Sequence, residues 1–507
     1  MDENKKHFCV IGSGASGLVS IKSCLEEDCL VTCYERYEDI GGLWRYTESS
    51  VEDKACVSKS TVINTCKEMT SFSDFPTPDD YPNFMRHDLV LEYFRMYAEH
   101  FKLIPHIQFN TQVLKVEPNV DYGATGKWKV TVKNAKTEEE SSNVFDGVFV
   151  GIGHHVTPNV PEFKGLDKFK GKVLHSHDYK RGDLFTDQNV LVVGLGNSGG
   201  DAAVELCRYA KNTFVSTRRG TWVFPRSQPN GVPTDLGLSR FNFDLFSYMP
   251  QWMINWVLEN LVMKIDHDLL GIKPKHPPMS QHGFVNDDFP NRILSGLIKI
   301  RPDIDRFDED SVTFLDGTRE SIDAVILATG YKFGFPFIDK SVLPVENNRV
   351  DLYKMIFPLK LEKPTLAIIG CIQPHGSVIA ITEIQARWAI QVVQGKMKLP
   401  SPEEQVEEVR NRQQRMAQRY VSSQRHTIQV DGTQYMDEIA QELGCMPSVK
   451  DVLKSGDLRL AMALYFGGVA PYQYRLVGPH AWNGARDILL RMDERVKIPL
   501  RNSVTKQ

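Results

Sequence analysis

Two glycine-rich turns, each placed between a buried strand and a helix, predict an α/β chain with two nested Rossmann-like dinucleotide-binding domains. The strand that closes each unit repeats one pattern, D-x-V-x-x-x-x-G, at 146–153 and again at 323–330. The segment 365–370 then reads as a further strand of the first unit. The second unit is therefore predicted to be inserted into the first.

The first glycine turn follows a buried strand over 8–11 and opens a helix that we expect to reach residue 27. Its G-x-G-x-x-G spacing permits a tight turn, close approach to a pyrophosphate and close packing of helix on strand. The helix N-terminus offers free N–H groups to phosphate. Glu35 ends the next strand, where a carboxylate can bind ribose hydroxyls. The candidate residues of this first site are Gly12, Ser13, Gly14, Ala15, Ser16, Gly17 and Glu35.

A loop and a polar segment downstream are further candidates for cofactor contacts. Gly42, Leu43 and Trp44 suit a loop in which a flat ring system lies against the backbone, although a packed turn explains this composition equally well. Asn64 and Thr65 lie in the turn-rich stretch 60–86. The amide of Asn64 could hydrogen-bond a cofactor or could hold a turn.

Between the two glycine turns, the pattern predicts a helix and a small sheet. Apolar residues at helical spacing predict a helix over 87–101. Alternation over 107–116 and 127–133 predicts a small antiparallel meander.

The second glycine turn carries the signal for a second coenzyme. It follows a strand over 189–193 and precedes a helix over 198–210 and a strand over 213–216. The position that corresponds to Glu35 is a threonine, and two arginines follow it. A ribose 2′-phosphate requires this loss of a carboxylate and gain of guanidinium groups, so we expect NADPH here; two solvated arginines are the alternative. The candidate residues are Gly194, Leu195, Gly196, Asn197, Ser198, Gly199, Thr217, Arg218 and Arg219.

The stretch 220–300 is longer than a βαβ unit needs and is predicted to be a helical insertion. It contains Trp222, Trp252 and Trp256 among many apolar residues, so it could cover an active site or rest on a membrane. Further along, the S-P-E-E sequence from residue 401 predicts a capped helix start. The apolar stretch 461–474 is predicted to be packed core.

The bulk composition excludes several classes of protein. A net charge of -4 without a Lys/Arg block argues against nucleic-acid binding. Nine cysteines without a C-x-x-C fit a reducing compartment and argue against a disulfide reductase. No run of 18 apolar residues and no signal peptide is present. His175 and His177 lack a third ligand nearby, so we expect no metal and assign them a structural role at a domain junction.

The segment between the two turns reads F-x-G-x-x-x-H-x-x-x-Y, from Phe169 to Tyr179. Together with both glycine turns, G-G-L-W-R at 41–45 and A-T-G at 328–330, it makes the whole chain resemble the flavin-containing monooxygenases. The ending Tyr179-Lys180 differs from the Trp-Pro/Asp ending of the dedicated Baeyer–Villiger signature.

The resemblance implies FAD at the first site, NADPH at the second, and a small-molecule substrate and O2 as partners. It implies that NADPH reduces FAD and that O2 adds at flavin C4a. The resulting C4a-hydroperoxyflavin then oxygenates soft nucleophilic nitrogen or sulfur, with Baeyer–Villiger oxidation of ketones as an additional activity. Asn64 is the implied catalytic residue, which supports the hydroperoxide together with retained NADP+. The implied FAD contacts include Gly12, Gly14, Gly17, Glu35, Gly42, Leu43, Trp44, Asn64 and Thr65, and Thr329 is a further cofactor candidate.

Two other functions are conceivable on the same fold. An NADPH oxidase that releases hydrogen peroxide without oxygenating a substrate needs the same two cofactors. A non-enzymatic binding protein on the same fold would need a damaged glycine turn, and both turns are intact.

The expected domain division follows from the nesting. The FAD-binding domain comprises 1–155 and 330–445, and the NADPH-binding domain comprises 156–329 with the insertion 220–300. Residues 446–507 are expected to pack on the active-site side without a transmembrane anchor. We expect an intracellular enzyme, at the endoplasmic reticulum membrane surface by family resemblance or cytosolic because the usual anchor is absent; a homodimer stays open.

Overall fold

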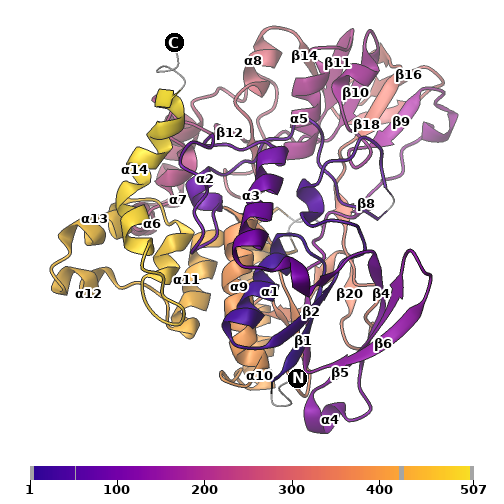
Figure 1. Cartoon of the computed structure of the whole chain (residues 1–507). Coiled ribbons are helices and arrows are strands. Elements are labelled where there is room, and N and C mark those ends of the chain that lie inside the picture. Colours follow the sequence, from indigo (N-terminus) through magenta and orange to yellow (C-terminus); the bar gives the residue numbers. More distant parts are fainter. Residues whose placement is uncertain (1–4, 52, 422–426, 503–507) are drawn as a thin grey trace.

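Two parallel sheets of five strands each form the frame of the molecule in a computed structural model that describes residues 5–51, 53–421 and 427–502 (Figure 1). The expectation about the last residues, 503–507, lies outside this range. Both sheets are flanked by helices, and the β-strand that precedes each glycine turn is the central strand of its sheet. The predicted α/β class with two Rossmann-like units is thereby confirmed.

The first sheet has the order β24-β7-β1-β2-β3. Its strands are short, apolar and almost wholly buried, as expected for parallel strands covered on both faces. Helices α1 and α9 pack against each other beside this sheet. The elements of this half are β1 (His7–Ile11), β2 (Leu30–Tyr34), β3 (Ile107–Gln108), β7 (Gly147–Val150), β24 (Leu366–Ile368), α1 (Ala15–Glu26), α2 (Lys67–Thr70), α3 (His87–His100) and α9 (Val378–Val393).

The second sheet has the order β14-β11-β10-β18-β9. Helix α5 follows the second glycine turn and packs against α8. The elements are β9 (Lys172–His175), β10 (Asn189–Val193), β11 (Asn212–Ser216), β14 (Ile298–Arg301), β18 (Ala324–Leu327), α5 (Asn197–Leu206) and α8 (Phe289–Leu294).

Small antiparallel sheets extend both halves, and one of them joins the two connecting segments. Strands β8 (Thr157–Pro158) and β19 (Tyr331–Lys332) pair where the chain leaves and re-enters the first half. The others are β4 (Thr111–Pro118), β5 (Trp128–Asn134) and β6 (Glu140–Phe145), then β15 (Ile304–Phe307), β16 (Ser311–Phe314) and β17 (Arg319–Ser321), and the pairs β20 (Val345–Glu346) with β21 (Arg349–Val350) and β22 (Leu352–Tyr353) with β23 (Phe357–Pro358).

The strand predicted over 107–116 is two strands in different sheets. Strand β3 joins the first parallel sheet and β4 begins the meander. Asn110 between them has a φ of 54°, a left-handed conformation that ends a strand.

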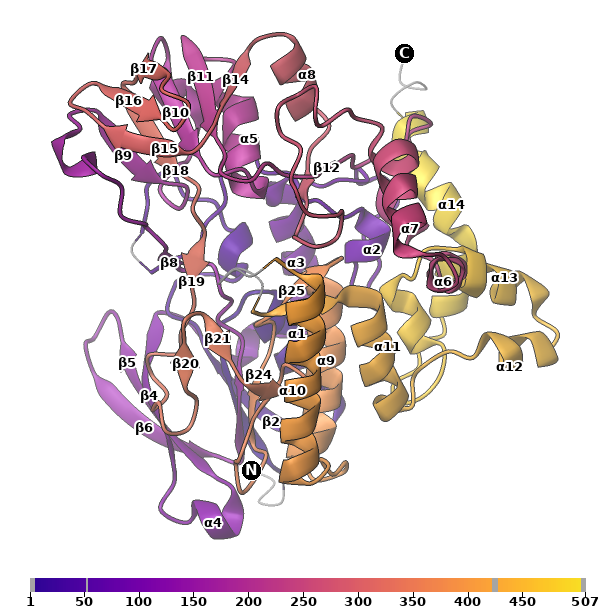
Figure 2. The same cartoon turned by 180° about the vertical axis from the view of Figure 1, so that it is seen from behind.

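The long stretch 220–300 contains helices, as predicted, but also strands of both small and large sheets. Its helices α6 (Arg240–Ser247), α7 (Gln251–Val257) and the π-helix η6 (Leu258–Met263) lie beside α13 (Leu458–Phe466) at one side of the molecule, which Figure 2 shows from behind. Strands β12 (Val223–Phe224) and β13 (Phe284–Val285) pair with each other. Strand β14 begins inside this stretch.

The C-terminal region is held against the first half by buried charges. Arg475, whose side chain is 1% exposed, pairs with Glu26 of α1 and Glu383 of α9. The predicted capped helix start is confirmed, because Ser401 and Glu404 form a reciprocal capping box. Within the stretch 461–474, Leu464 and Tyr472 are buried, whereas Met462 and Phe466 are more than half exposed. The remaining elements are α4 (Tyr122–Thr125), α10 (Pro402–Arg419), α11 (Gly432–Leu443), α12 (Val449–Lys454), η7 (Pro471–Arg475), α14 (Ala485–Asn502), β25 (Gln373–His375) and β26 (Gln429–Asp431).

Candidate functional site

The first glycine turn has the geometry that its spacing predicts. Gly12 has a φ of 91°, and a Cβ added at Gly17 would lie 1.8 Å from the Gly12 carbonyl oxygen, so helix α1 sits against the turn as only glycine allows. Gly14 and the exposed Gly42 face each other across the turn, with only 3.2 Å from a Cβ added at Gly42 to the Gly14 Cα. No side chain caps the N-terminus of α1, and no acidic residue lies in its first turn.

Glu35 is buried at the end of β2 and holds the first turn from beneath. Its Oε2 accepts hydrogen bonds from the Ser13 backbone N–H at 2.7 Å and from the Ser13 hydroxyl at 2.8 Å. Its Oε1 accepts from the Tyr37 N–H at 3.0 Å. The carboxylate that the sequence assigned to ribose therefore also fixes the backbone that would meet the pyrophosphate.

The other residues predicted for the first site lie around this turn. Leu43 and Trp44 are half-buried in the 3₁₀ turn η1 (Gly42–Trp44), and the Gly41 N–H donates to the Ser13 carbonyl at 3.1 Å. Ala15 and Ser16 begin α1. Thr329 lies near the β8–β19 pair, where its hydroxyl donates to the Asn159 carbonyl at 2.6 Å.

The second glycine turn repeats this arrangement with more open space. Gly194 has a φ of 101°, and a Cβ added at Gly199 would lie 2.1 Å from the Gly194 oxygen. A Cβ added at Gly196 would meet nothing within 4 Å, so a cradle stands open over the N-terminus of α5. Exposed Ser198 lies at this end, and Leu195 is buried.

Two predicted coenzyme residues of the second site also contact protein, and two others have no protein partner among the described residues. Asn197 accepts a hydrogen bond from the Val285 N–H at 3.0 Å, and the Thr217 hydroxyl accepts from the Gly220 N–H at 3.1 Å. Arg218 and Arg219 are exposed and make no hydrogen bond or ion pair with any residue that the structure describes. Open glycine cradles, uncapped helix N-termini and unpaired guanidinium groups fit two phosphate-bearing dinucleotides.

A cavity of about 1930 Å³ extends from the first half to the insertion and the C-terminal helices. Asn64 and Thr65 line it, together with Phe243 of α6, Ile254 of α7 and Leu489 of α14. By area its wall is mainly apolar, and many polar and charged side chains also line it, so it offers both kinds of contact that a small-molecule site uses.

Arg226 is the charged residue that the structure places beside Asn64. Its Nη2 donates to Asn64 Oδ1 at 2.9 Å, and its backbone N–H donates to Asp287 Oδ1 at 3.0 Å. A single sequence could not reveal this contact, because the two residues are far apart in the chain and Arg226 lies in no motif. His282 and His375, whose rings stack 5.3 Å apart in the cavity wall, were missed for the same reason.

Burial perturbs several titratable groups near the junction of the two halves. Burial raises the pKa of Asp201 on α5 and of Asp235 in the cavity wall, each to about 6. It lowers the pKa of His154 to about 4 and, helped by His154 and His282, holds the pKa of His155 well below its usual range. The two carboxyl groups are therefore mostly ionised near physiological pH and take up a proton only as the pH falls through about 6, whereas the two imidazoles stay neutral at physiological pH.

The F-x-G-x-x-x-H-x-x-x-Y segment packs the second sheet and joins the two halves. The Phe169 ring leaves no room for a side chain at Gly171. His175 Nε2 lies 3.0 Å from the Gly330 carbonyl, and Tyr179 donates to Glu205 at 3.0 Å. Glu205 also accepts from Ser60 of the first half at 2.6 Å.

His177 is buried, with its Nε2 2.9 Å from the Lys54 carbonyl. No group of three or more potential metal ligands occurs among the described residues.

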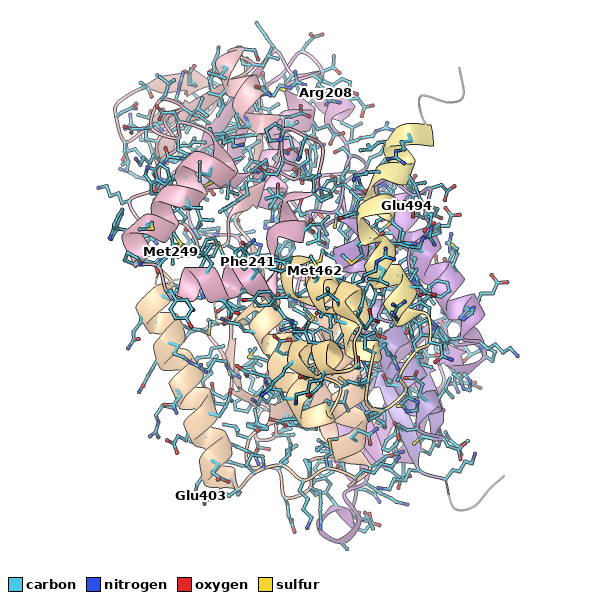
Figure 3. All side chains as sticks on the ribbon, turned by 90° about the vertical axis from the view of Figure 1, so that its left-hand side faces the viewer. Arg208, Phe241, Met249, Glu403, Met462 and Glu494 are labelled. Carbon is cyan, nitrogen blue, oxygen red and sulfur yellow. The ribbon has the colours of Figure 1, made fainter. Side chains whose placement is uncertain are left out.

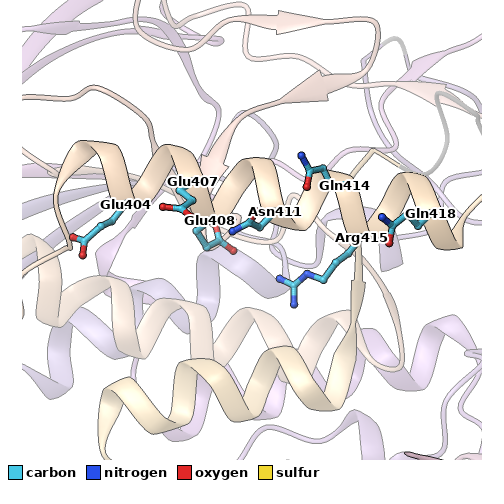
Figure 4. Close-up of a pocket in the computed structure, with 7 residues that line it drawn as sticks. All are labelled: Glu404, Glu407, Glu408, Asn411, Gln414, Arg415 and Gln418. Atoms are coloured by element: carbon cyan, nitrogen blue, oxygen red, sulfur yellow. The ribbon is translucent and has the colours of Figure 1, made fainter.

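A second hollow, of about 580 Å³, runs along α10 (Figure 4). It is lined by polar side chains of this one helix, which project alongside each other rather than toward a common point. It lies apart from both glycine turns and offers no converging groups for chemistry.

Comparison with known proteins gives a consistent result. The family model for flavin-binding monooxygenase-like proteins matches residues 5–507. Flavin-containing monooxygenase 5 of Cavia porcellus is 48% identical over 99% of this chain and 95% of its own length. Dimethylaniline monooxygenase [N-oxide-forming] 2 of Pan troglodytes is 43% identical over 99% of this chain and 94% of its own length.

A solved structure shares the fold. S-allyl-L-cysteine S-oxygenase from Allium sativum superimposes with a TM-score of 0.67 at 24% identity, over 98% of this chain and 99% of that one. The chain belongs to the flavin-binding monooxygenase-like family and is thus a flavin-containing monooxygenase, an NADPH-dependent oxidoreductase.

Proposed function

We propose that this enzyme oxygenates soft nitrogen and sulfur centres of small molecules with NADPH and O2, and that it also inserts oxygen into ketones. The observation that carries the proposal is the Asn64–Arg226 pair at the wall of the large, mainly apolar cavity. An amide and a guanidinium beside an apolar chamber can hold a polar reacting group while the walls exclude water.

The two glycine turns support the assignment of the cofactors to sites. The first turn, with Gly14 and Gly42 face to face and Glu35 beneath, would hold FAD, with Leu43 and Trp44 beside it and Asn64 and Thr65 toward its ring system. The second turn, with its open cradle at Gly196, would hold NADPH, whose 2′-phosphate Arg218 and Arg219 would bind. Bound flavin supplies the activation of O2 and NADPH supplies the electrons.

The protein's own contribution is orientation and protection. Asn64 has an amide N–H₂ that can donate toward the cavity, because Arg226 already occupies its carbonyl oxygen. Arg226 is itself positioned by Asp287, with 3.6 Å between the guanidinium and the carboxylate. The pair thus presents hydrogen-bond donors at one point of a chamber with mostly apolar walls.

The guanidinium is the reason to add ketone oxidation to heteroatom oxidation. A fixed positive charge beside a reacting centre stabilises negative charge that develops there. Attack on an electrophilic carbonyl needs an anionic oxygen nucleophile, whereas transfer to sulfur or nitrogen needs a protonated one. Arg226 therefore favours the first reaction without preventing the second.

Product analysis with a thioether and a linear ketone, offered in parallel to the FAD-loaded enzyme with NADPH, tests the proposal. We expect sulfoxide from the first and ester from the second. Sulfoxide without ester would refute the ketone activity, and ester alone would refute the heteroatom activity. Peroxide in place of both products would identify an NADPH oxidase.

The domain division is part of the same proposal. Residues 1–155 and 330–445 would form the FAD-binding domain and 156–329 the NADPH-binding domain. In support, each stretch holds one complete parallel sheet, and the β8–β19 pair lies at both crossings. The segment 446–507 would close the cavity, which residues of α13 and α14 line.

We also propose a peripheral contact with a membrane surface, at the endoplasmic reticulum if the chain shares the location of its family. Exposed apolar side chains gather on α6, α7 and α13, on the side that faces the viewer in Figure 3, where Phe241, Met249 and Met462 are labelled. Tyr248 is 89% exposed, Trp252 69% and Trp256 54%. Aromatic side chains at this density suit a lipid interface. None of the described helices is long and apolar enough to cross a bilayer.

A further inference from the structure

Residues 226–235 form a short hairpin of the insertion that contacts the Asn64 loop at two points. The hairpin is closed by hydrogen bonds from Gln228 N–H to the Val232 carbonyl and from Thr234 N–H to the Arg226 carbonyl, both of 2.8 Å. At one end, Arg226 donates to Asn64. At the other end, Asp235 Oδ2 accepts the backbone N–H of Cys66 at 2.7 Å.

The loop 64–66 is held from both halves of the molecule. Its own half holds it at both flanks, by Ile63 N–H to the Met85 carbonyl at 2.9 Å and Lys67 N–H to the Asn83 carbonyl at 2.7 Å, and inside the loop by the Thr65 hydroxyl, which lies 2.7 Å from the Thr70 hydroxyl. The Cys66 carbonyl accepts from the N–H groups of Met69 and Thr70 in α2, whereas the Cys66 N–H is bound across the two halves, by Asp235. A carboxylate acceptor makes that bond roughly twice as strong as a neutral one would be.

Asp235 has features that a mere loop tie would not need. It lines the same cavity as Asn64. Its second oxygen, Oδ1, is buried and has no hydrogen-bond partner among the described residues. An unpartnered buried carboxylate oxygen is costly, and a polar group retained at such a cost calls for a functional explanation.

We propose that Asp235 is a positioning residue that holds the Asn64 loop against the cavity through the Cys66 N–H, so that coupling of NADPH use to oxygenation depends on its carboxylate. The proposal rests on the function proposed above. Asp235 need not touch substrate or cofactor, because it acts through the loop that carries Asn64.

Protonation gives the proposal a measurable signature. Burial raises the pKa of Asp235 to about 6, so the carboxylate is present above this pH and is lost as the pH falls through it. A neutral carboxyl group is a weaker acceptor, so the loop loosens on the acid side. The Cys66 thiol hydrogen-bonds the Asp235 carboxyl group, and the charged residues that line the same cavity include Arg226, Arg459 and Asp493.

The experiment measures hydrogen peroxide released per NADPH consumed by the FAD-loaded enzyme, with a thioether substrate that does not itself titrate, from pH 5.5 to pH 8.5. The native enzyme should release more peroxide as the pH falls through about 6. Asp235→Asn should release roughly fivefold more peroxide than the native enzyme at pH 8, as for one lost charge-assisted bond, and should show no acid limb. Asp235→Glu should restore the acid limb.

Asp268→Asn is the charge-matched control, because it removes one carboxylate from an exposed residue of the insertion that is not among the residues lining the cavity. It should behave like the native enzyme. Melting temperature and flavin content, measured for each variant, separate a positioning role from a loss of fold.

A native peroxide yield that stays flat across pH 6 would overturn the proposal without any variant. So would an Asp235→Asn profile that matches the native one. Failure of the proposed function has a different appearance, because the native enzyme would then form no sulfoxide at any pH.

Discussion

Asn64 and Arg226 are joined across the two halves of the molecule by a hydrogen bond of 2.9 Å at the wall of the large cavity. Asn64 belongs to a loop of the first half, and Arg226 belongs to the insertion that follows the second glycine turn. The residue that we propose to support oxygenation is therefore held by the half that we propose to bind NADPH. Correct placement of Asn64 therefore depends on correct docking of the half that carries Arg226.

Replacement of Asn64 by leucine should uncouple the enzyme. The side chain keeps its size but loses the donor amide, so flavin reduction by NADPH should be unchanged while peroxide per NADPH rises on the order of tenfold. Arg226→Met should act in the same direction, and the double variant should show less than the sum of the two effects because the residues form one unit. Rapid-mixing reduction rates and a peroxide assay measure both quantities.

Gln434→Leu is the control for these variants, since it removes an exposed amide from another part of the same cavity wall. Unchanged coupling in Asn64→Leu would reduce Asn64 to a turn residue.

Arg218 and Arg219 should decide the choice of coenzyme. Neither guanidinium has a protein partner among the described residues, so both are available to a 2′-phosphate. Replacement of both by alanine should weaken NADPH binding by about 2–4 kcal/mol and leave NADH binding unchanged. The ratio of kcat/KM for the two coenzymes measures this, with Arg410→Ala on α10 as a control for loss of one exposed arginine. Equal kcat/KM values for NADPH and NADH in the native enzyme would contradict a role of the two arginines in binding the 2′-phosphate.

The sequence predicted those parts of the fold in which the residues that contact each other are also close together in the chain. The two glycine turns, their strands and the helix α3 were found because spacing within about 20 residues carries the information. The split of the strand 107–116 was missed because side-chain alternation continues across Asn110, whereas the break is a backbone conformation.

Most residues of the cavity wall could not be predicted from the sequence, for a different reason. Arg226, Asp235 and His282 gain their meaning only from residues far along the chain, and none stands in a motif. Asn197 is a motif residue whose amide oxygen already accepts the Val285 N–H, a contact that its spacing in the motif does not reveal. Spacing locates the turn, but it does not say which side chains of the turn are already engaged.

Asp201 should make the stability of the enzyme depend on pH. Burial raises its pKa to about 6, opposed by Arg226, so the folded state binds this proton more tightly than the unfolded state does. Its contribution to stability is present at low pH and is lost as the pH rises through about 6.

In the native enzyme, the Asn286 amide donates to Asp201 Oδ1 at 2.8 Å. Asp201→Asn removes the negative charge and keeps an oxygen that can accept this hydrogen bond. The free energy of unfolding of the variant, relative to that of the native enzyme, should increase by on the order of 1 kcal/mol between pH 5 and pH 7. Above pH 7 this difference should stay constant. Melting temperatures across this range test the expectation, with exposed Asp288→Asn as the control. A difference that does not vary with pH would show that the shift in pKa is absent.

The exposed apolar side chains of α7 should bind the enzyme to vesicles. Trp252 and Trp256 are one turn apart and both more than half exposed, so both can enter the same interface. Trp252→Ser with Trp256→Ser should weaken binding to neutral phosphatidylcholine vesicles at least about tenfold, because buried aromatic area is lost while charge is unchanged. Val120→Ser, a fully exposed apolar residue in the β4–α4 connection, should leave flotation unchanged. Equal flotation of the double variant and the native enzyme would contradict a membrane contact through α7, and loss of flotation in Val120→Ser would indicate adhesion without a defined face.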